Sequence, residues 1–146
     1  MLCAAAVYLE KHGSPKSVHE LADHACLRIA NPSTTPEWTM TDGKKTFTFN
    51  PTGQLVGDNP EVILHGTCSG LGIAMLPRFS AIDKIRSGEL VIVLPGWRSP
   101  EIGIYALMPS RKFLEAKTRA WLELLKSELP KTLKRDAGLP VGQVEP

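Results

Sequence analysis

The 146-residue sequence has few aromatic residues, few cysteines and no long apolar run. Its three Trp, two Tyr and four Phe do not alternate with Lys or Arg, which argues against a platform that stacks single-stranded nucleic acid. No stretch approaches the ~18 apolar residues of a membrane-spanning helix, so we expect no membrane contact. The three cysteines, Cys3, Cys26 and Cys68, form no CxxC pair, which predicts free thiols in a reducing compartment.

An export signal and a strong charge of one sign are also missing. No basic residue precedes the apolar residues 2–8, and Glu10 with Lys11 interrupts that stretch, so we expect a cytoplasmic protein. The net charge is +2, and its basic excess falls in residues 111–136. There the Lys and Arg residues alternate with glutamates, which favours a solvated helix face over a nucleic-acid-binding surface.

Apolar periodicity, turn formers and helix caps together predict an α/β fold. Strands are expected at residues 26–30, 37–41, 46–50, 55–56, 73–76, 90–94 and 102–108, with 37–50 forming a hairpin that buries one face. Helices are expected at residues 4–11, 18–22, 60–69, 77–88 and 111–129. Asn59 suits an N-cap before Pro60, and Gly70 suits the end of the same helix. Strands that alternate with helices, together with a hairpin, indicate a mixed sheet.

The expected helix at residues 111–129 carries the clearest amphipathic pattern. At about 100° per residue, half of its circumference is apolar. That half contains Phe113, Leu114, Trp121, Leu122, Leu124, Leu125 and Leu129. So wide an apolar arc favours packing on a sheet over a coiled coil. After Pro130 the sequence is polar and broken by Gly and Pro, so residues 130–146 are expected to form a flexible tail.

One short motif has the spacing of a catalytic nucleophile. Gly66-Thr67-Cys68-Ser69-Gly70 matches the small–nucleophile–small pattern of a hydrolase elbow, and His65 is close by. An elbow needs a strand before the nucleophile and a helix after it, and the expected order here is the reverse. We therefore expect no catalytic residue and no enzyme activity.

The sequence contains no recognisable cofactor or metal motif. Gly70-Leu71-Gly72 lacks the third glycine of a dinucleotide fingerprint and precedes a strand instead of following one. His12, His19, His24 and Cys26 are close in sequence, but their irregular spacing matches no common zinc pattern. We expect neither a cofactor nor a bound metal.

Several segments, in order, resemble the effector-binding domain of LysR-type transcriptional regulators. The likeness starts at Leu2-Cys-Ala-Ala-Ala-Val-Tyr-Leu-Glu-Lys-His-Gly13 and continues through Leu21-Ala-Asp-His-Ala-Cys-Leu27 and Glu37-Trp38. It is strongest at Gly70-Leu-Gly-Ile-Ala-Met-Leu-Pro77, at Gly88-Glu-Leu-Val-Ile-Val-Leu-Pro95 with Trp97, and at Tyr105-Ala-Leu-Met-Pro-Ser-Arg111. This ordered set covers residues 2–129 and resembles the CrgA-like branch of the family.

The resemblance implies a fold like that of periplasmic solute-binding proteins, with two lobes and a small effector between them. Residues 6–95 would form lobe two, and residues 1–5 and 96–129 would be crossover segments and the remnant of lobe one. The winged helix-turn-helix of the family has no counterpart here, so the chain is expected to be N-terminally truncated. DNA binding would then belong only to the missing N-terminal domain of the full-length protein.

The candidate effector site follows from the geometry of open α/β sheets, where ligands bind beyond the carboxyl ends of the strands. That rule selects Asn31, Pro32, Ser33 and Thr34 after the strand expected at residues 26–30. Asp58 and Asn59 are added because the helix start at Asn59-Pro60 offers free N–H groups. Ile102, just after the second crossover, is included as well. A helix start favours an anion, whereas Asp58 argues against one, so the charge of the effector stays open.

Two further expectations concern alternatives and assembly. A solute-binding protein fragment would share this architecture, but it would require an export signal. A small cysteine hydrolase is disfavoured by the reversed elbow. Because the apolar faces of residues 102–108 and 111–129 would pack on a lobe that is absent, we expect the chain to form a homo-oligomer.

Overall fold

A five-stranded mixed sheet organises the first of two units in the computed structural model, which describes residues 1–30, 36–101, 103–107 and 115–137. The units are Met1–Pro100 and Glu101–Val144. The strands of the sheet are β1 (Leu2–Ala5), β2 (Cys26–Ile29), β5 (Val56–Gly57), β6 (Ile73–Met75) and β7 (Leu90–Ile92). Their order is β5-β2-β6-β1-β7, with β2 parallel to β5 and β6, and β1 antiparallel to β6 and β7. The predicted α/β mixed sheet is therefore confirmed.

The strand β1 corrects one expectation. A helix was predicted over residues 4–11, but Ala4 and Ala5 belong to β1, and the helix α1 spans Ala6–His12. Alanine favours helices locally, yet β1 lies between two strands that satisfy its backbone on both sides. All four of its residues are buried, and three of them, Cys3, Ala4 and Ala5, have small side chains that let the covering layers approach closely.

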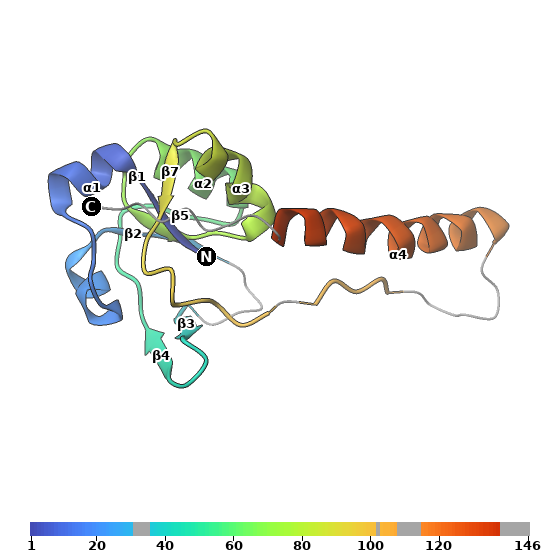
Figure 1. Cartoon of the computed structure of the whole chain (residues 1–146), viewed down its shortest axis with the longest axis horizontal. Coiled ribbons are helices and arrows are strands. Elements are labelled where there is room, and N and C mark those ends of the chain that lie inside the picture. Colours follow the sequence, from blue (N-terminus) through green and yellow to red (C-terminus); the bar gives the residue numbers. More distant parts are fainter. Residues whose placement is uncertain (31–35, 102, 108–114, 138–146) are drawn as a thin grey trace. The chain divides into compact units, whose positions relative to one another are not determined.

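Two helices cover one face of the sheet. They are α2 (Pro60–Cys68) and α3 (Arg78–Arg86), and Figure 1 shows both on the same side. Their buried residues Ile63, Leu64 and Ala81 form one core with alternate sheet residues such as Leu27 and Ala74. The predicted cap and stop of α2 are confirmed, because the Asn59 side chain caps its start and Gly70 follows its end with φ 76°.

A β-hairpin covers the opposite face. Its strands are β3 (Trp38–Thr41) and β4 (Thr46–Phe49), and Figure 1 shows them below the sheet. Trp38 and Met40 are buried against the second set of alternate sheet residues, so the predicted hairpin with one buried face is confirmed. The 3-10 helix η1 (Val18–Asp23) and Tyr8 of α1 join the same core. Thr41 also pairs with Arg98, which ties the segment after β7 to the hairpin.

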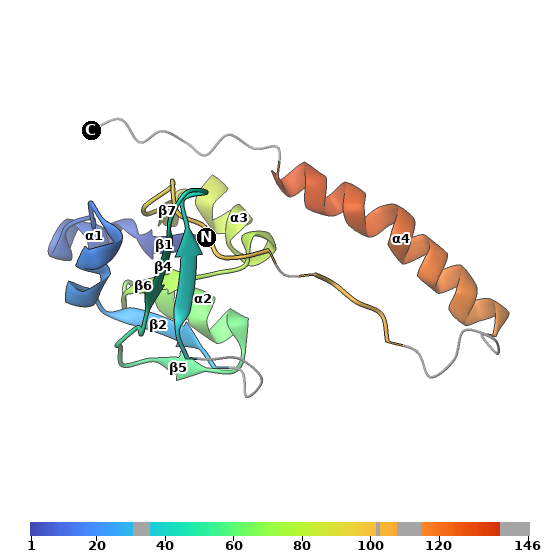
Figure 2. The same cartoon turned by 90° about the horizontal axis from the view of Figure 1, so that it is seen from below.

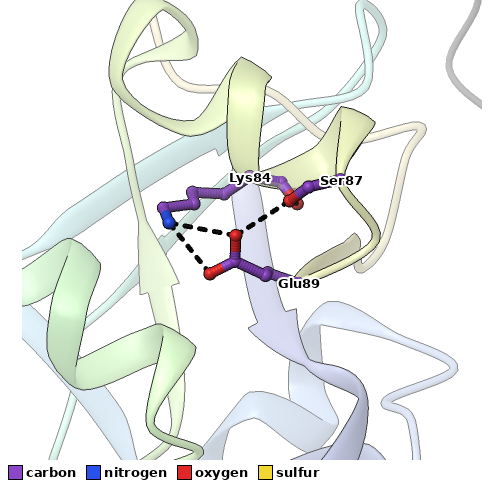
Figure 3. A network of polar contacts seen from close by, with 3 residues as sticks. All are labelled: Lys84, Ser87 and Glu89. Carbon is purple, nitrogen blue, oxygen red and sulfur yellow. Dashed lines mark hydrogen bonds and ion pairs between the residues drawn. The ribbon is translucent and has the colours of Figure 1, made fainter.

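A small polar network closes the turn between α3 and β7. The Lys84 ammonium donates to both carboxylate oxygens of Glu89, at 3.0 and 2.9 Å. The Ser87 hydroxyl donates to Glu89 as well, at 3.0 Å, as Figure 3 shows. Gly88, with φ 80°, makes the reversal at low steric cost. The three side chains hold the end of the helix to the start of the strand.

The second unit differs from expectation in two places. Residues 103–107 form no strand, although a strand was predicted over 102–108, of which 102 and 108 lie outside the described residues. Among the residues that the structure describes, no strand pairs with this segment, and Leu107 is 94 % exposed. A strand without a partner leaves its backbone hydrogen-bonding groups unpaired, which explains the difference.

The long helix α4 spans Ala116–Ala137, so the prediction that it ends at 129 is wrong. Residues 111–114 of the predicted helix lie outside the described residues. Pro130 lies inside α4 and removes a single N–H donor. An ion pair of Lys131 with Glu128, at 2.7 Å, spans the turn that contains Pro130. Neither α4 nor any other described helix is long and apolar enough to cross a membrane.

Candidate functional site

The carboxyl ends of β2 and β5 lie side by side at one edge of the sheet. Arg28 pairs with Val56, and Ile29 pairs with Gly57, in parallel register. The Ala30 amide donates to the Gly57 carbonyl oxygen at 2.7 Å, which carries the pairing one step past both strands. The carboxyl ends of the two strands are therefore adjacent, as Figure 2 shows. This is the location where open α/β sheets place their ligands.

Only two of the seven predicted site residues fall within the described part of the chain. Asp58 and Asn59 follow β5 directly and are exposed. Asn31, Pro32, Ser33, Thr34 and Ile102 lie outside the described residues. The structure thus places one predicted segment at the strand ends and leaves the other untested.

Asn59 is engaged in helix capping. Its side-chain oxygen accepts a hydrogen bond from the Glu61 amide at 2.9 Å, and its carbonyl oxygen accepts from the amides of Val62 and Ile63. The start of α2 is therefore already satisfied in part by its own cap. Asp58 next to it adds a negative charge, so this helix start is not by itself an anion site.

Arg28 lies near the same strand ends and is not among the residues predicted from the sequence. It is the third residue of β2 and shares the sheet face of Cys26, where the hairpin packs. Its Nε atom is buried and has no hydrogen-bond partner among the described residues. The signal in the sequence was a cation at an inward-facing position of the otherwise apolar segment 26–30. A buried, unpaired nitrogen of a charged group is costly, so it calls for an explanation.

A second buried polar group lies beside α1. The Tyr8 hydroxyl and His24 Nδ1 are 3.1 Å apart, and the Ala25 amide donates to the same hydroxyl at 3.0 Å. The hydroxyl accepts from Ala25, and the tautomer of the His24 imidazole sets the direction of its hydrogen bond with Nδ1. Burial lowers the pKa of His24, and His12 lowers it further. Burial also raises the pKa of Tyr8.

The histidines and the cysteine that are close in sequence between residues 12 and 26 make contacts within the first unit. His12 stacks on Tyr8, with ring centroids 4.6 Å apart, and His19 meets the edge of Phe47. The Cys26 thiol donates to the Leu21 carbonyl oxygen. Within the described ranges, no three His, Cys, Asp or Glu side chains gather as a metal ion would require.

The surroundings of Cys68 do not suit a nucleophile. Cys68 ends α2, and β6 follows it, which is the reverse of an elbow. Burial raises the pKa of its thiol, and Glu89 raises it further. A thiol with a raised pKa contains little of the reactive thiolate at neutral pH. The geometry therefore agrees with a structural role for this cysteine.

Comparisons with known proteins all lead to one family. Residues 1–130 match the family model described as LysR substrate binding domain. The chain is 34% identical over 111 residues to the HTH-type transcriptional regulator PtxR of Pseudomonas aeruginosa, which covers 76% of this chain and 36% of PtxR. It is 30% identical over 126 residues to the HTH-type transcriptional activator AaeR of Escherichia coli, covering 86% of this chain and 40% of AaeR. The chain therefore spans well under half the length of these curated relatives.

Solved structures give the same result for the fold. The regulatory domain of AphB from Vibrio vulnificus matches with a TM-score of 0.72 and 26% identity, over 88% of this chain and 63% of that chain. The regulatory domain of CrgA, a LysR-type transcriptional regulator from Neisseria meningitidis, matches with a TM-score of 0.69 and 25% identity, again over 88% and 63%.

Proposed function

Because the chain belongs to the LysR substrate-binding domain family, the effector-binding regulatory domain of LysR-type transcriptional regulators, we propose that it binds a small effector to control transcription. The family resemblance noted in the sequence, including the likeness to CrgA, is confirmed. The expectation of a non-enzymatic protein is confirmed as well, because the family consists of regulators. We assign contact with DNA to a helix-turn-helix domain of a longer protein. We propose that this longer protein acts in the cytoplasm.

The observation that carries this proposal is the shared edge of β2 and β5. Their register brings Ile29 next to Gly57, so the segments that follow them start from adjacent points. An effector at this edge would contact Asp58 and Asn59 on one side. The proposal assigns Asn31, Pro32, Ser33, Thr34 and Ile102 to the remaining contacts.

The domain division is part of the proposal. Residues 6–95 correspond to lobe two of the family fold, and residues 1–5 and 96–129 to crossover segments and a remnant of lobe one. The flexible tail predicted for 130–146 is not kept as drawn, because residues 130–137 belong to α4. The pairing of Thr41 with Arg98 supports a fixed path for the chain as it leaves lobe two. One lobe offers only part of a binding site, so weak affinity is expected.

Backbone amide signals in a magnetic resonance titration test the site. The 146-residue chain is mixed with small molecules that are anionic, neutral and cationic. Binding at the proposed edge shifts the amide signals of Ile29 and residues 56–59. The α3–β7 turn around Ser87 serves as an internal control and is expected not to move. Shifts confined to that turn, or no shifts with any compound, would contradict the proposed site.

Self-association is proposed as well, through exposed apolar side chains of the second unit. Trp121 is 59 % exposed and Leu124 is 56 % exposed, and both lie on α4. Large exposed apolar groups favour association, most often with two-fold symmetry. Sedimentation of the chain is expected to show a dimer or larger species that Trp121→Glu weakens. The matched variant Lys126→Glu changes the opposite, polar side of α4 and is expected to leave association intact. A monomeric parent chain would refute this proposal.

A further inference from the structure

The guanidinium of Arg28 is placed where a ligand of the candidate site would meet it. Arg28 is near the carboxyl end of β2, one residue before the point where Ile29 pairs with Gly57. Its side chain is partly exposed, while its Nε atom is fully covered and unpaired within the described residues. The group thus stands at the boundary of the protein, with one donor directed inward and unused.

Binding of an anion would stabilise an arginine whose Nε atom is buried and unpaired. Five N–H donors surround the guanidinium, and two of them form a fork that matches a carboxylate. The ion pairs found in the described part of the chain join other residues, such as Lys84 with Glu89 and Arg86 with Asp83. The charge of Arg28 is therefore not neutralised by a carboxylate of the described fold, although its Nε is desolvated.

The neighbours of Arg28 indicate the chemistry of the rest of the ligand. Val56, its register partner on the edge strand β5, shares its sheet face and is 46 % exposed. On the other side, Leu27 pairs with Ala74, so the next step of the register brings Arg28 beside the half-buried Met75. The cation is thus flanked by aliphatic surface on both sides. This combination suits a small organic acid with an apolar body.

A phosphate group fits less well at this position. A dianion is normally held by several cations or backbone amides, whereas Arg28 stands alone on its strand and Asp58 follows close behind β5. A single carboxylate requires one fork and tolerates a hydrated aspartate nearby.

From this arrangement we infer that Arg28 binds the carboxylate of an organic-acid effector, with Val56 and Met75 contacting its apolar part. The inference rests on the proposed function and deepens it by naming the chemical class of the ligand. It also answers the question that Asp58 left open, because the cation is on the sheet and not at the start of α2. The competing explanation is structural: the arginine stem covers apolar surface and the head group is only tolerated.

The test uses sodium butyrate and its neutral counterpart butyramide as probes, added to the intact 146-residue chain. The readout is the Nε–H magnetic resonance signal of Arg28, identified by its loss in Arg28→Lys. Butyrate is expected to shift this signal saturably, and butyramide to leave it in place. Arg28→Lys keeps the stem and the charge but loses the fork, so butyrate affinity should fall by about tenfold or more. Arg86→Lys, on the exposed face of α3, is the matched control and should bind butyrate as the parent does.

The outcomes separate this inference from the proposed function. Equal shifts with both probes, or unchanged butyrate affinity in Arg28→Lys, would overturn the role of Arg28 and favour the structural explanation. If neutral or cationic compounds shift the amides of residues 56–59 while the Arg28 signal stays fixed, the inference fails and the proposed function stands. If no compound shifts either set, both fail. Amide spectra of each variant verify that the fold is retained.

Discussion

The two units of the chain contain similar apolar residues, which are buried in the first unit and exposed in the second. In Met1–Pro100, Ile63 and Ile73 are completely buried. In Glu101–Val144, Tyr105 is 82 % exposed and Trp121 is 59 % exposed. The first unit contains a sheet with a helical layer on one face and a hairpin on the other, so each apolar face meets a second layer. The comparison teaches that an apolar stripe becomes a core only where a second layer exists to cover it.

Core truncation is expected to produce the largest difference between the units. Ile63→Ala leaves a cavity between α2 and the sheet and should cost about 2–5 kcal/mol of unfolding free energy. Leu124→Ala in α4, where the side chain is 56 % exposed, should change it by at most about 0.5 kcal/mol. Hydrogen exchange of the amides in β1 and β6 measures the unfolding free energy of both variants. Comparable losses would show that the second unit has a core of its own.

Removal of a tyrosine hydroxyl sharpens the same comparison. Tyr8→Phe leaves the Ala25 amide and His24 Nδ1 without their partner and should cost about 1–3 kcal/mol. Tyr105→Phe removes the same group from an exposed ring and should have no measurable effect. Urea denaturation compares the two variants. A neutral Tyr8→Phe would mean that the buried hydrogen bonds contribute nothing net.

Just below pH 6.5, the pH dependence of stability should arise from a histidine of the first unit. The pKa of His24 in the folded chain lies below its ordinary value of 6.5, chiefly because of burial, and Asp23 and Glu20 offset only part of this effect. Between that lowered pKa and 6.5 the unfolded chain binds a proton that the folded chain does not, so stability falls as the pH drops through this window. Denaturation curves from pH 7.5 to 5 should show the loss, and His24→Gln should reduce it. The same slope in both proteins would exclude His24 as its cause.

Loss of a helix cap is expected to have a smaller effect. Asn59→Ala removes the acceptor for the Glu61 amide and should cost about 0.5–2 kcal/mol, whereas Asn59→Asp keeps the cap. In α4, Ser127→Ala removes a hydroxyl that bonds only within its own turn, to Leu124 and Glu128. That variant should be neutral or slightly stabilising, because alanine is the best helix former. Thermal denaturation read by circular dichroism distinguishes the three.

Surface ion pairs are expected to give the smallest effects of all. Glu89→Gln weakens the contact with Lys84 that joins α3 to β7, and Glu123→Gln weakens a contact with Lys126 inside α4. Exposed pairs contribute little, so only the first should lower the denaturation midpoint, and slightly. The difference should vanish in concentrated salt, where exposed charges are screened. A difference that persists in salt would point to packing instead of charge.

Local signals predicted much of the first unit but only part of its site. The cap at Asn59, the stop at Gly70 and the alternation of residues 37–50 each act over a few residues, and the structure confirms the elements that they define. The strand β1 escaped notice because its alanines favour a helix in isolation. Arg28 was missed because a single cation in an apolar strand is readily taken for a surface residue. Its buried Nε atom is visible only once the covering layer is in place.

Sequence alone determined the α/β class, the α2 and α3 helices, the hairpin and the family, because these depend on caps, turns, periodicity and an ordered set of segments. The tertiary structure decided which neighbours each strand has, and with them the position of β1 and the shared edge of β2 and β5. It also decided that residues 103–107 form no strand and that α4 continues past Pro130. Pairing and burial are relations between segments distant in the chain, so no local pattern contains them.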